Sequence, residues 1–160
     1  LRCEADRRTD VDVLIAAGCT PGILGAALMR LHSEWDGCAK PRAMTETDAR
    51  LLMGNIKTLP RVLTILSDWA ALRGLDAPMR LAQAVIAHWL DSTCHACHGR
   101  GHEVIPGTPS LGRKCKACHG TGRRKEPKGE AGRLMLSLME DCVVRARTSI
   151  KKRLRQSMDV

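Results

Sequence analysis

Residues 94–122 read CHACHGRGHEVIPGTPSLGRKCKACHGTG and contain two copies of the pattern Cys-x-x-Cys-x-Gly-x-Gly. Two residues between paired cysteines allow a tight turn to direct both sulfurs at one ion. Seventeen residues separate the inner cysteines, Cys97 and Cys115, a spacing typical of four-cysteine zinc sites. We therefore predict one Zn²⁺ per chain, bound by Cys94, Cys97, Cys115 and Cys118. Four thiolates leave no open coordination position, so this zinc is expected to be structural.

Two glycines follow each cysteine pair, and the turn geometry explains them. A chain leaving such a turn needs positive φ or a close approach to sulfur, which glycine tolerates best. We expect this of Gly99, Gly101, Gly120 and Gly122.

Two other uses of cysteine, haem attachment and disulfide bonding, are less compatible with this sequence. Each copy also contains Cys-x-x-Cys-His, the attachment motif of c-type haem, with His98 and His119 as the histidines. Haem needs a large apolar cradle, however, and the chain contains no Phe and no Tyr. Eight Cys in 160 residues is also far below the density of small disulfide scaffolds, which favours the reducing cytoplasm. The remaining cysteines lack paired spacing and are expected to be small apolar residues: Cys3, Cys19, Cys38 and Cys142.

Apolar residues outside residues 94–122 recur at helical spacing. Helices are expected over residues 9–17, 21–36, 45–53, 59–73, 76–90 and 129–156. The predicted buried faces are Leu24, Leu28, Leu31 and Trp35; Leu59, Val62, Leu66, Trp69 and Leu72; Met79, Ala82, Ile86 and Trp89; and Met135, Leu138, Cys142, Ala146, Ile150 and Leu154. We expect no more β structure than one short ribbon, which would pair residues 103–105 with residues 112–114.

These expectations give a mainly α fold in three parts. A helical bundle covers residues 1–93, and a four-cysteine zinc-knuckle module, hereafter the cysteine module, covers residues 94–125. A basic helix over residues 126–160 packs back on the bundle. No apolar run approaches the roughly 18 residues of a membrane span. We therefore do not expect a membrane protein. The sequence contains no motif of a catalytic site, so we do not expect an enzyme either.

Charge divides the chain sharply. Residues 1–93 hold 11 Lys and Arg against 11 Asp and Glu, whereas residues 94–160 hold 15 against 6, the whole net excess of +9. A basic region built on zinc knuckles favours nucleic acid as the partner. The expected DNA contacts are Arg100, Arg113, Lys114, Lys116, Arg123, Arg124 and Lys125. A merely solvated basic surface stays an alternative, and residues 66–90 can be interpreted either as a helix-turn-helix or as an ordinary helical hairpin.

The repeated motif resembles the cysteine-rich module of DnaJ-type co-chaperones. Those proteins carry four copies on a β-rich frame and a J domain with a His-Pro-Asp tripeptide, which this sequence lacks. The chain is more similar to the lambda-type phage antitermination proteins Q, which also order a helical segment, CxxCHGxG, a second CxxCxGxG, a basic stretch and C-terminal helices. The likeness covers residues 45–156 in architecture and residues 94–122 in motif.

This resemblance implies a specific function. Proteins of the family bind double-stranded DNA at a phage late promoter, join bacterial RNA polymerase paused with its sigma factor, and make it read through terminators. The family acts in the cytoplasm of the bacterial host. Two other hypotheses stay open: a zinc-finger DNA-binding transcription regulator, and a DnaJ-like zinc module for protein interaction.

Overall fold

The computed structural model describes residues 21–41, 44–105, 107 and 110–158. It contains, in chain order, α2 (Pro21–Asp36), α3 (Glu46–Gly54), α4 (Leu59–Leu72), α5 (Pro78–Leu90), β1 (His102–Val104), β2 (Leu111–Lys114) and α6 (Gly129–Met158). The mainly helical fold with a four-cysteine cluster, a short ribbon and a long C-terminal helix is therefore confirmed. The helix expected over residues 9–17 lies outside the described residues.

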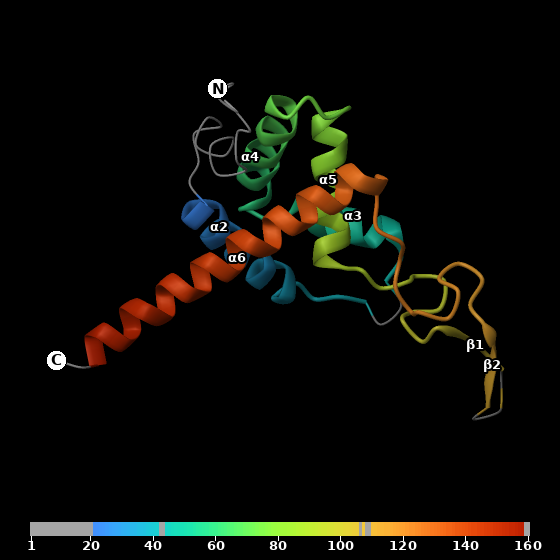
Figure 1. Cartoon of the computed structure of the whole chain (residues 1–160). Coiled ribbons are helices and arrows are strands. Elements are labelled where there is room, and N and C mark those ends of the chain that lie inside the picture. The colour runs from blue at the N-terminus through green and yellow to red at the C-terminus, as the bar shows by residue number, and fades with distance from the viewer. Residues whose placement is uncertain (1–20, 42–43, 106, 108–109, 159–160) are drawn as a thin grey trace, which may run out of the picture.

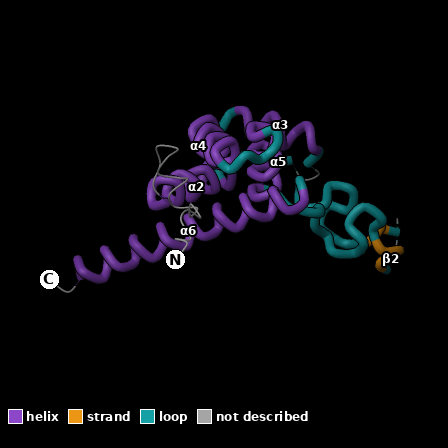
Figure 2. The backbone as a smooth tube through the Cα atoms, turned by 45° about the horizontal axis from the view of Figure 1, so that its top comes forward, coloured by secondary structure: helices purple, strands orange, loops and turns teal. Residues whose placement is uncertain are grey.

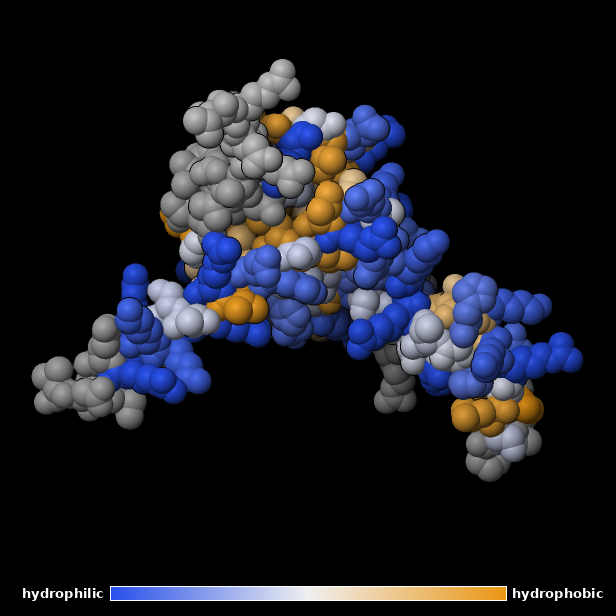
Figure 3. All heavy atoms as spheres, viewed as in Figure 1, coloured by the Kyte–Doolittle hydropathy of each residue, from blue (hydrophilic) through white to orange (hydrophobic). Residues whose placement is uncertain are grey.

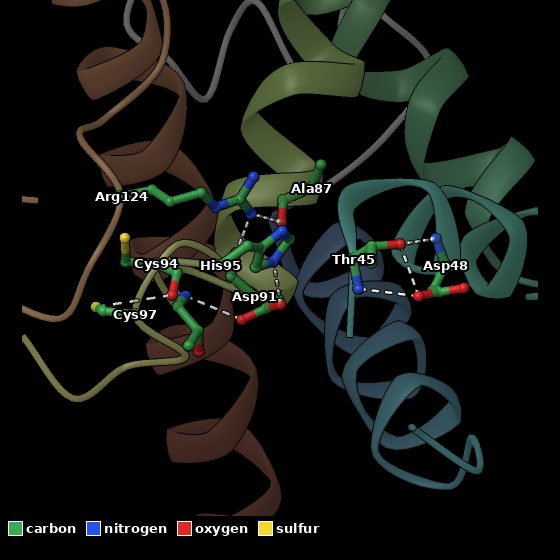
Figure 4. Close-up of polar contacts among 9 residues, drawn as sticks. Thr45, Asp48, Ala87, Asp91, Cys94, His95, Cys97 and Arg124 are labelled. Carbon is green, nitrogen blue, oxygen red and sulfur yellow. Dashed lines mark hydrogen bonds and ion pairs between the residues drawn. The ribbon is translucent and has the colours of Figure 1, made fainter. Parts of the chain in front are cut away.

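The start of α3 follows from its capping residues. The Thr45 hydroxyl accepts a hydrogen bond from the Asp48 N–H at 3.2 Å, and the Asp48 carboxylate accepts one from the Thr45 N–H at 2.9 Å (Figure 4). This reciprocal capping box satisfies two backbone donors that would otherwise lack partners. The prediction that the helix starts at Thr45 is confirmed to within one residue.

One hydrophobic core joins α2, α4, α5 and α6. Its largest buried side chains include Trp35 and Trp69. The predicted α2 face is fully buried, comprising Leu24, Leu28, Leu31 and Trp35. Among the described residues, no helix combines the length and apolar character that crossing a membrane requires.

The buried faces of α4 and α5 differ in part from the prediction. In α4, Leu72 is 49% exposed because it lies in the last turn, beside the Gly74 turn at φ +68°. In α5, Met79 is 45% exposed, while Leu81 and Val85 are buried beside the predicted Ala82 and Ile86. The face that α5 turns to the core is thus rotated from the predicted one, because its packing against α4 and α6 selects Leu81 and Val85.

Helix α6 runs from the cysteine module across the bundle and continues beyond it on the opposite side (Figures 1 and 2). It approaches α2 closely at Gly25, where an added Cβ would lie 2.1 Å from the carbonyl oxygen of Cys142. Met135, Leu138 and Cys142 are buried as predicted, as is Ala146. Ile150 and Leu154 were predicted on the same buried stripe but are 45% and 59% exposed, because α6 has passed the end of α2 there.

The cysteine module projects from the bundle near the start of α6 (Figure 1). Its ribbon pairs His102 with Lys114 and Val104 with Leu111 in antiparallel register. The predicted ribbon is present, one residue from the expected bounds. A further bridge pairs Thr93 with Arg123, so the two chain segments that join the module to the helices are themselves paired.

Candidate metal centre

The two cysteine pairs converge on one point. The Sγ atoms of Cys94 and Cys115 lie 4.0 Å apart and those of Cys97 and Cys118 3.7 Å apart. All four sulfurs lie within 4.8 Å of one another. A tetrahedral ion with metal–sulfur bonds of about 2.3 Å places its sulfurs about 3.8 Å apart, whereas a disulfide needs about 2.05 Å. The cluster therefore fits a bound metal ion, is compatible with zinc, and is too open for disulfides.

The four cysteines are buried, and backbone N–H groups point at two of their sulfurs. Each is at most 6% exposed. The N–H of Gly101 points to the Cys97 sulfur at 3.2 Å, and the N–H of Gly122 points to the Cys118 sulfur at the same distance. Such donors stabilise a thiolate over a thiol. The second sulfur of each pair therefore accepts a backbone hydrogen bond from the last glycine of its own pattern.

Each cysteine pair forms one knuckle with the two glycines that follow it: residues 94–101 are the first knuckle and residues 115–122 the second. An approximate two-fold symmetry relates the two knuckles, as the hydrogen bonds between them show. The N–H of Cys94 donates to the carbonyl of Gly122 at 2.9 Å, and the N–H of Cys115 donates to the carbonyl of Gly101 at 2.8 Å. Each knuckle therefore begins on the last glycine of the other. This exchange of hydrogen bonds orients the two turns face to face.

The glycine prediction is confirmed at all four positions. Gly99, Gly101, Gly120 and Gly122 have φ of +81°, +75°, +90° and +73°. Two of them are also in close contact across the symmetry. A Cβ on Gly101 would lie 2.4 Å from the Gly120 oxygen, and a Cβ on Gly122 would lie 2.4 Å from the Gly99 oxygen. Side chains at these two positions would force the knuckles apart.

The Cys118 thiol has an unusual acidity. Burial acts to raise its pKa, but hydrogen bonds from the backbone N–H groups of Gly122 and Gly120, and then from neighbouring thiols, lower the pKa to about 6. The lowered pKa favours the thiolate, which is the form that binds metal.

The surroundings of the two knuckles break the symmetry. His95 in the first knuckle corresponds to Lys116 in the second. His95 lies 3.1 Å from the carboxylate of Asp91, the C-cap residue that follows α5 (Figure 4). Lys116 is exposed. The first knuckle consequently docks on the bundle, and the second faces solvent with a cation.

Arg124 anchors the exit of the module. Its guanidinium donates to the backbone carbonyls of Ala87, at 3.3 Å, and of Asp91 (Figure 4). The backbone N–H of Arg124 donates to the carbonyl of Ser92 at 2.8 Å. A cation suits the C-terminal end of a helix, where carbonyls lack intrahelical partners. Sequence reasoning did not find this role, or that of the Asp91–His95 pair, because both join segments that only the fold brings together.

The seven predicted DNA-contact residues differ in their exposure to solvent. Arg124 is half-buried against α5, whereas six are exposed: Arg100, Arg113, Lys114, Lys116, Arg123 and Lys125. The aliphatic part of Lys114 lies over Gly120, where a Cβ would be 3.3 Å from the lysine Cδ. The exposed cations thus lie on both knuckles, on β2 and on the segment that leaves the module.

An apolar group lies at the far end of the ribbon. Val104, Ile105 and Leu111 are 57%, 43% and 73% exposed. Figure 3 shows this hydrophobic colour at the tip of the projecting module, next to hydrophilic side chains. Contiguous exposed apolar side chains are typical of interaction surfaces.

The other cysteines stand apart from the cluster. Cys142 is buried in the helical core, and the Cys38 thiol donates to the carbonyl of Glu34 at 3.3 Å. Cys3 and Cys19 lie outside the described residues.

Comparisons with protein-family models, with curated proteins and with solved structures gave no match to this chain.

Proposed function

We propose that the cysteine cluster binds one Zn²⁺ and that the module so formed binds DNA in a phage transcription antiterminator. The observation that carries the proposal is the placement of six exposed cations on a small frame whose turns are fixed by four converging thiolates. Zinc is the metal that a closed, tetrahedral all-thiolate site favours in proteins, and it would supply structure there, not chemistry.

DNA is favoured by charge and rigidity together. Phosphate contacts come from Lys and Arg side chains that a rigid scaffold places in register. The cysteine module carries three exposed cations at separate places: Lys116 on the second knuckle, Arg113 on β2, and Arg123 on the segment that leaves the module. Arg124 is left out of the proposed contacts because its guanidinium is already bound to carbonyls of α5.

The role in antitermination is supported by the resemblance of motif order to the phage proteins Q. The architecture supports such a role, because a basic module projects from a helical body (Figure 1). In this proposal the module holds DNA at the late promoter. The helical body then contacts RNA polymerase and its sigma factor and travels with the enzyme, which reads through terminators.

A second candidate is favoured by the apolar tip of the ribbon. Val104 and Leu111 are more than half exposed, as expected if the module binds unfolded or partner polypeptides. This DnaJ-like function predicts suppression of aggregation of a denatured substrate and equal affinity for all DNA sequences. A zinc-finger regulator that is not an antiterminator predicts promoter binding without any effect on elongation.

The deciding experiment is terminator read-through by purified bacterial RNA polymerase and sigma factor. Templates carry either the cognate late promoter region or an unrelated promoter upstream of the same terminator. We expect read-through to rise only on the cognate template and to require zinc-loaded protein. The double variant Arg113→Ala, Lys116→Ala, which leaves the cysteines untouched, should lose the effect. An unchanged terminated fraction on the cognate template would reject antitermination.

A further inference from the structure

A groove lies between the bundle and the segment that leaves the cysteine module. Its volume is about 690 Å³, within the range of pockets that hold ligands. Residues of α3, α4, α5 and the stretch 124–128 line it. The metal cluster lies elsewhere, and Lys125 is the one lining residue that also belongs to the proposed DNA contacts, so the zinc and DNA sites do not account for the groove as a whole.

One face of α5 forms a wall of the groove. Arg80, Gln83, Ala84 and Ala87 line it and stand at positions i, i+3, i+4 and i+7 of the helix. Arg80 and Ala87 are therefore about 10 Å apart along the axis, or two helical turns. The two alanines are half-exposed, so the wall between the long side chains is shallow. A second helix of two turns matches this length.

The remaining lining is largely apolar. Met53 from α3 and Leu59 and Leu63 from α4 are half-buried, and each lines the groove. Ile86 of α5, at 1% exposure, closes the inner side. These side chains retain apolar surface that an incoming Leu or Ile would cover, at about 25 cal/mol for each Å² removed from water.

The rim of the groove is basic. Among the described residues that line it, Glu46 is the one carboxylate, and it is paired with Arg50 at 2.7 Å. Arg80, Lys125 and Lys128 are exposed and form no ion pair within the described part of the chain. Burial and then the nearby Arg124 lower the pKa of His88, while the charges of Glu126 and Asp91 act in the opposite direction. The residues that line the rim therefore carry an excess of positive charge.

From this juxtaposition we infer that the groove is a docking site for an acidic amphipathic helix of a partner protein. Apolar side chains at i, i+3, i+4 and i+7 of that helix enter between α4 and α5, as in other helix-in-groove complexes. Its carboxylates meet Arg80 at one end and Lys125 and Lys128 at the other. This inference is independent of the proposed DNA binding and of the identity of the metal.

Nucleic acid fits the groove less well. Single strands bind on aromatic platforms, and among the described residues that line this groove there is no Trp. Duplex phosphates gain nothing from the apolar surface of Met53 and Leu63. A helix with one acidic and one apolar side satisfies both halves of the groove.

The test uses the zinc-loaded full chain and two labelled synthetic peptides of identical composition. One has leucines at i, i+3, i+4 and i+7 among glutamates, and the other has the leucines moved off that spacing. Fluorescence polarisation should show at least about tenfold tighter binding of the first peptide. Equal affinities would mean that charge alone attracts the peptides and would overturn the inference.

Two variants map the site. Arg80→Glu with Lys128→Glu should weaken the leucine-stripe peptide at least about tenfold, and Ala84→Glu, which fills the shallow wall on an exposed helix face, should do the same. Lys151→Glu with Lys152→Glu, on the end of α6 beyond the bundle, is the matched double charge reversal and should leave binding unchanged. Unchanged peptide affinity in the groove variants, or a loss of DNA affinity in them while peptide affinity persists, would overturn the inference.

Discussion

The guanidinium of Arg124 donates a hydrogen bond to the carbonyl oxygen of Ala87 in α5 at 3.3 Å. The same group also reaches the carbonyl of Asp91, whose side chain contacts His95 in the first knuckle. The entry and the exit of the cysteine module are therefore tied to the last turn of one helix. This connection fixes the direction in which the module and its exposed cations project.

Arg124→Met should destabilise the chain because the α5 carbonyls lose a charged donor in a half-buried place. We expect a loss of about 1–3 kcal/mol in the free energy of unfolding, measured by urea titration followed by circular dichroism. The neighbouring Arg123→Met is the control, since Arg123 is exposed and should change stability little. Equal effects of the two substitutions would contradict the anchoring role.

Gly101→Ala should open the metal cluster. Its added Cβ would lie 2.4 Å from the Gly120 oxygen, at a backbone φ of +75°. Gly107→Ala separates the two effects, because Gly107 has φ +79° but nothing within 4 Å of an added Cβ. The control should therefore show only the backbone strain, about 1 kcal/mol. Competition with a chromophoric chelator should show that only Gly101→Ala lowers metal affinity; equal affinities would refute the close-contact account.

Gly25→Ala should separate α6 from α2, since its Cβ would lie 2.1 Å from the backbone oxygen of Cys142. Gly22→Ala on the same helix has nothing within 4 Å of the added Cβ. That control should be neutral or stabilising by up to about 1 kcal/mol through helix propensity. Thermal unfolding midpoints provide the comparison, and a Gly25→Ala midpoint at or above that of Gly22→Ala would be inconsistent with the close helix contact.

The metal cluster and the helix pattern were predictable because their signals are local. Paired cysteines at fixed spacing, the Thr45–Asp48 cap and the single apolar stripe of α2 each depend on residues close in the sequence. The buried face of α5 could not be predicted, because this helix carries apolar residues on neighbouring faces and both Met79 and Leu81 satisfy a helical period. The fold, through α4 and α6, selects Leu81.

The exposure of Ile150 and Leu154 has a similar cause. Their spacing continues the stripe of Met135 and Cys142, and helical periodicity says nothing about where a partner helix ends. Arg124 shows the same limit for the site. Within a run of basic residues nothing local distinguishes the one whose guanidinium reaches α5.

Lys116→Ala should weaken DNA binding without affecting the fold, since the side chain is exposed on the outer knuckle. Loss of one phosphate contact should lower the slope of log affinity against log salt by about one, equally for all DNA sequences. Lys57→Ala removes an equally exposed lysine of the bundle and should leave the slope unchanged. Fluorescence anisotropy over a salt series measures both, and identical slopes for the two variants would argue against DNA binding by the knuckle.

Metal binding should weaken in acid. The pKa of Cys118 is lowered from 9.0 to about 6 in the folded chain, although burial alone would raise it. The thiolate therefore contributes to stability fully above pH 9.0, and this contribution declines as the pH falls towards about 6 and is absent below it. Because bound metal further favours the thiolate, we expect metal release only below about pH 6, followed with a metal-sensitive dye. Half-release at neutral pH would contradict this ordering.

We propose that the four cysteines hold one zinc ion, and elemental analysis of the purified chain tests this claim most directly. We predict about one zinc per chain, lost from the double variant Cys94→Ser, Cys115→Ser and retained by Cys38→Ser, whose thiol lies outside the cluster. A chain without stoichiometric zinc, one carrying iron with a haem absorption band, or a double variant that keeps its zinc would contradict the claim.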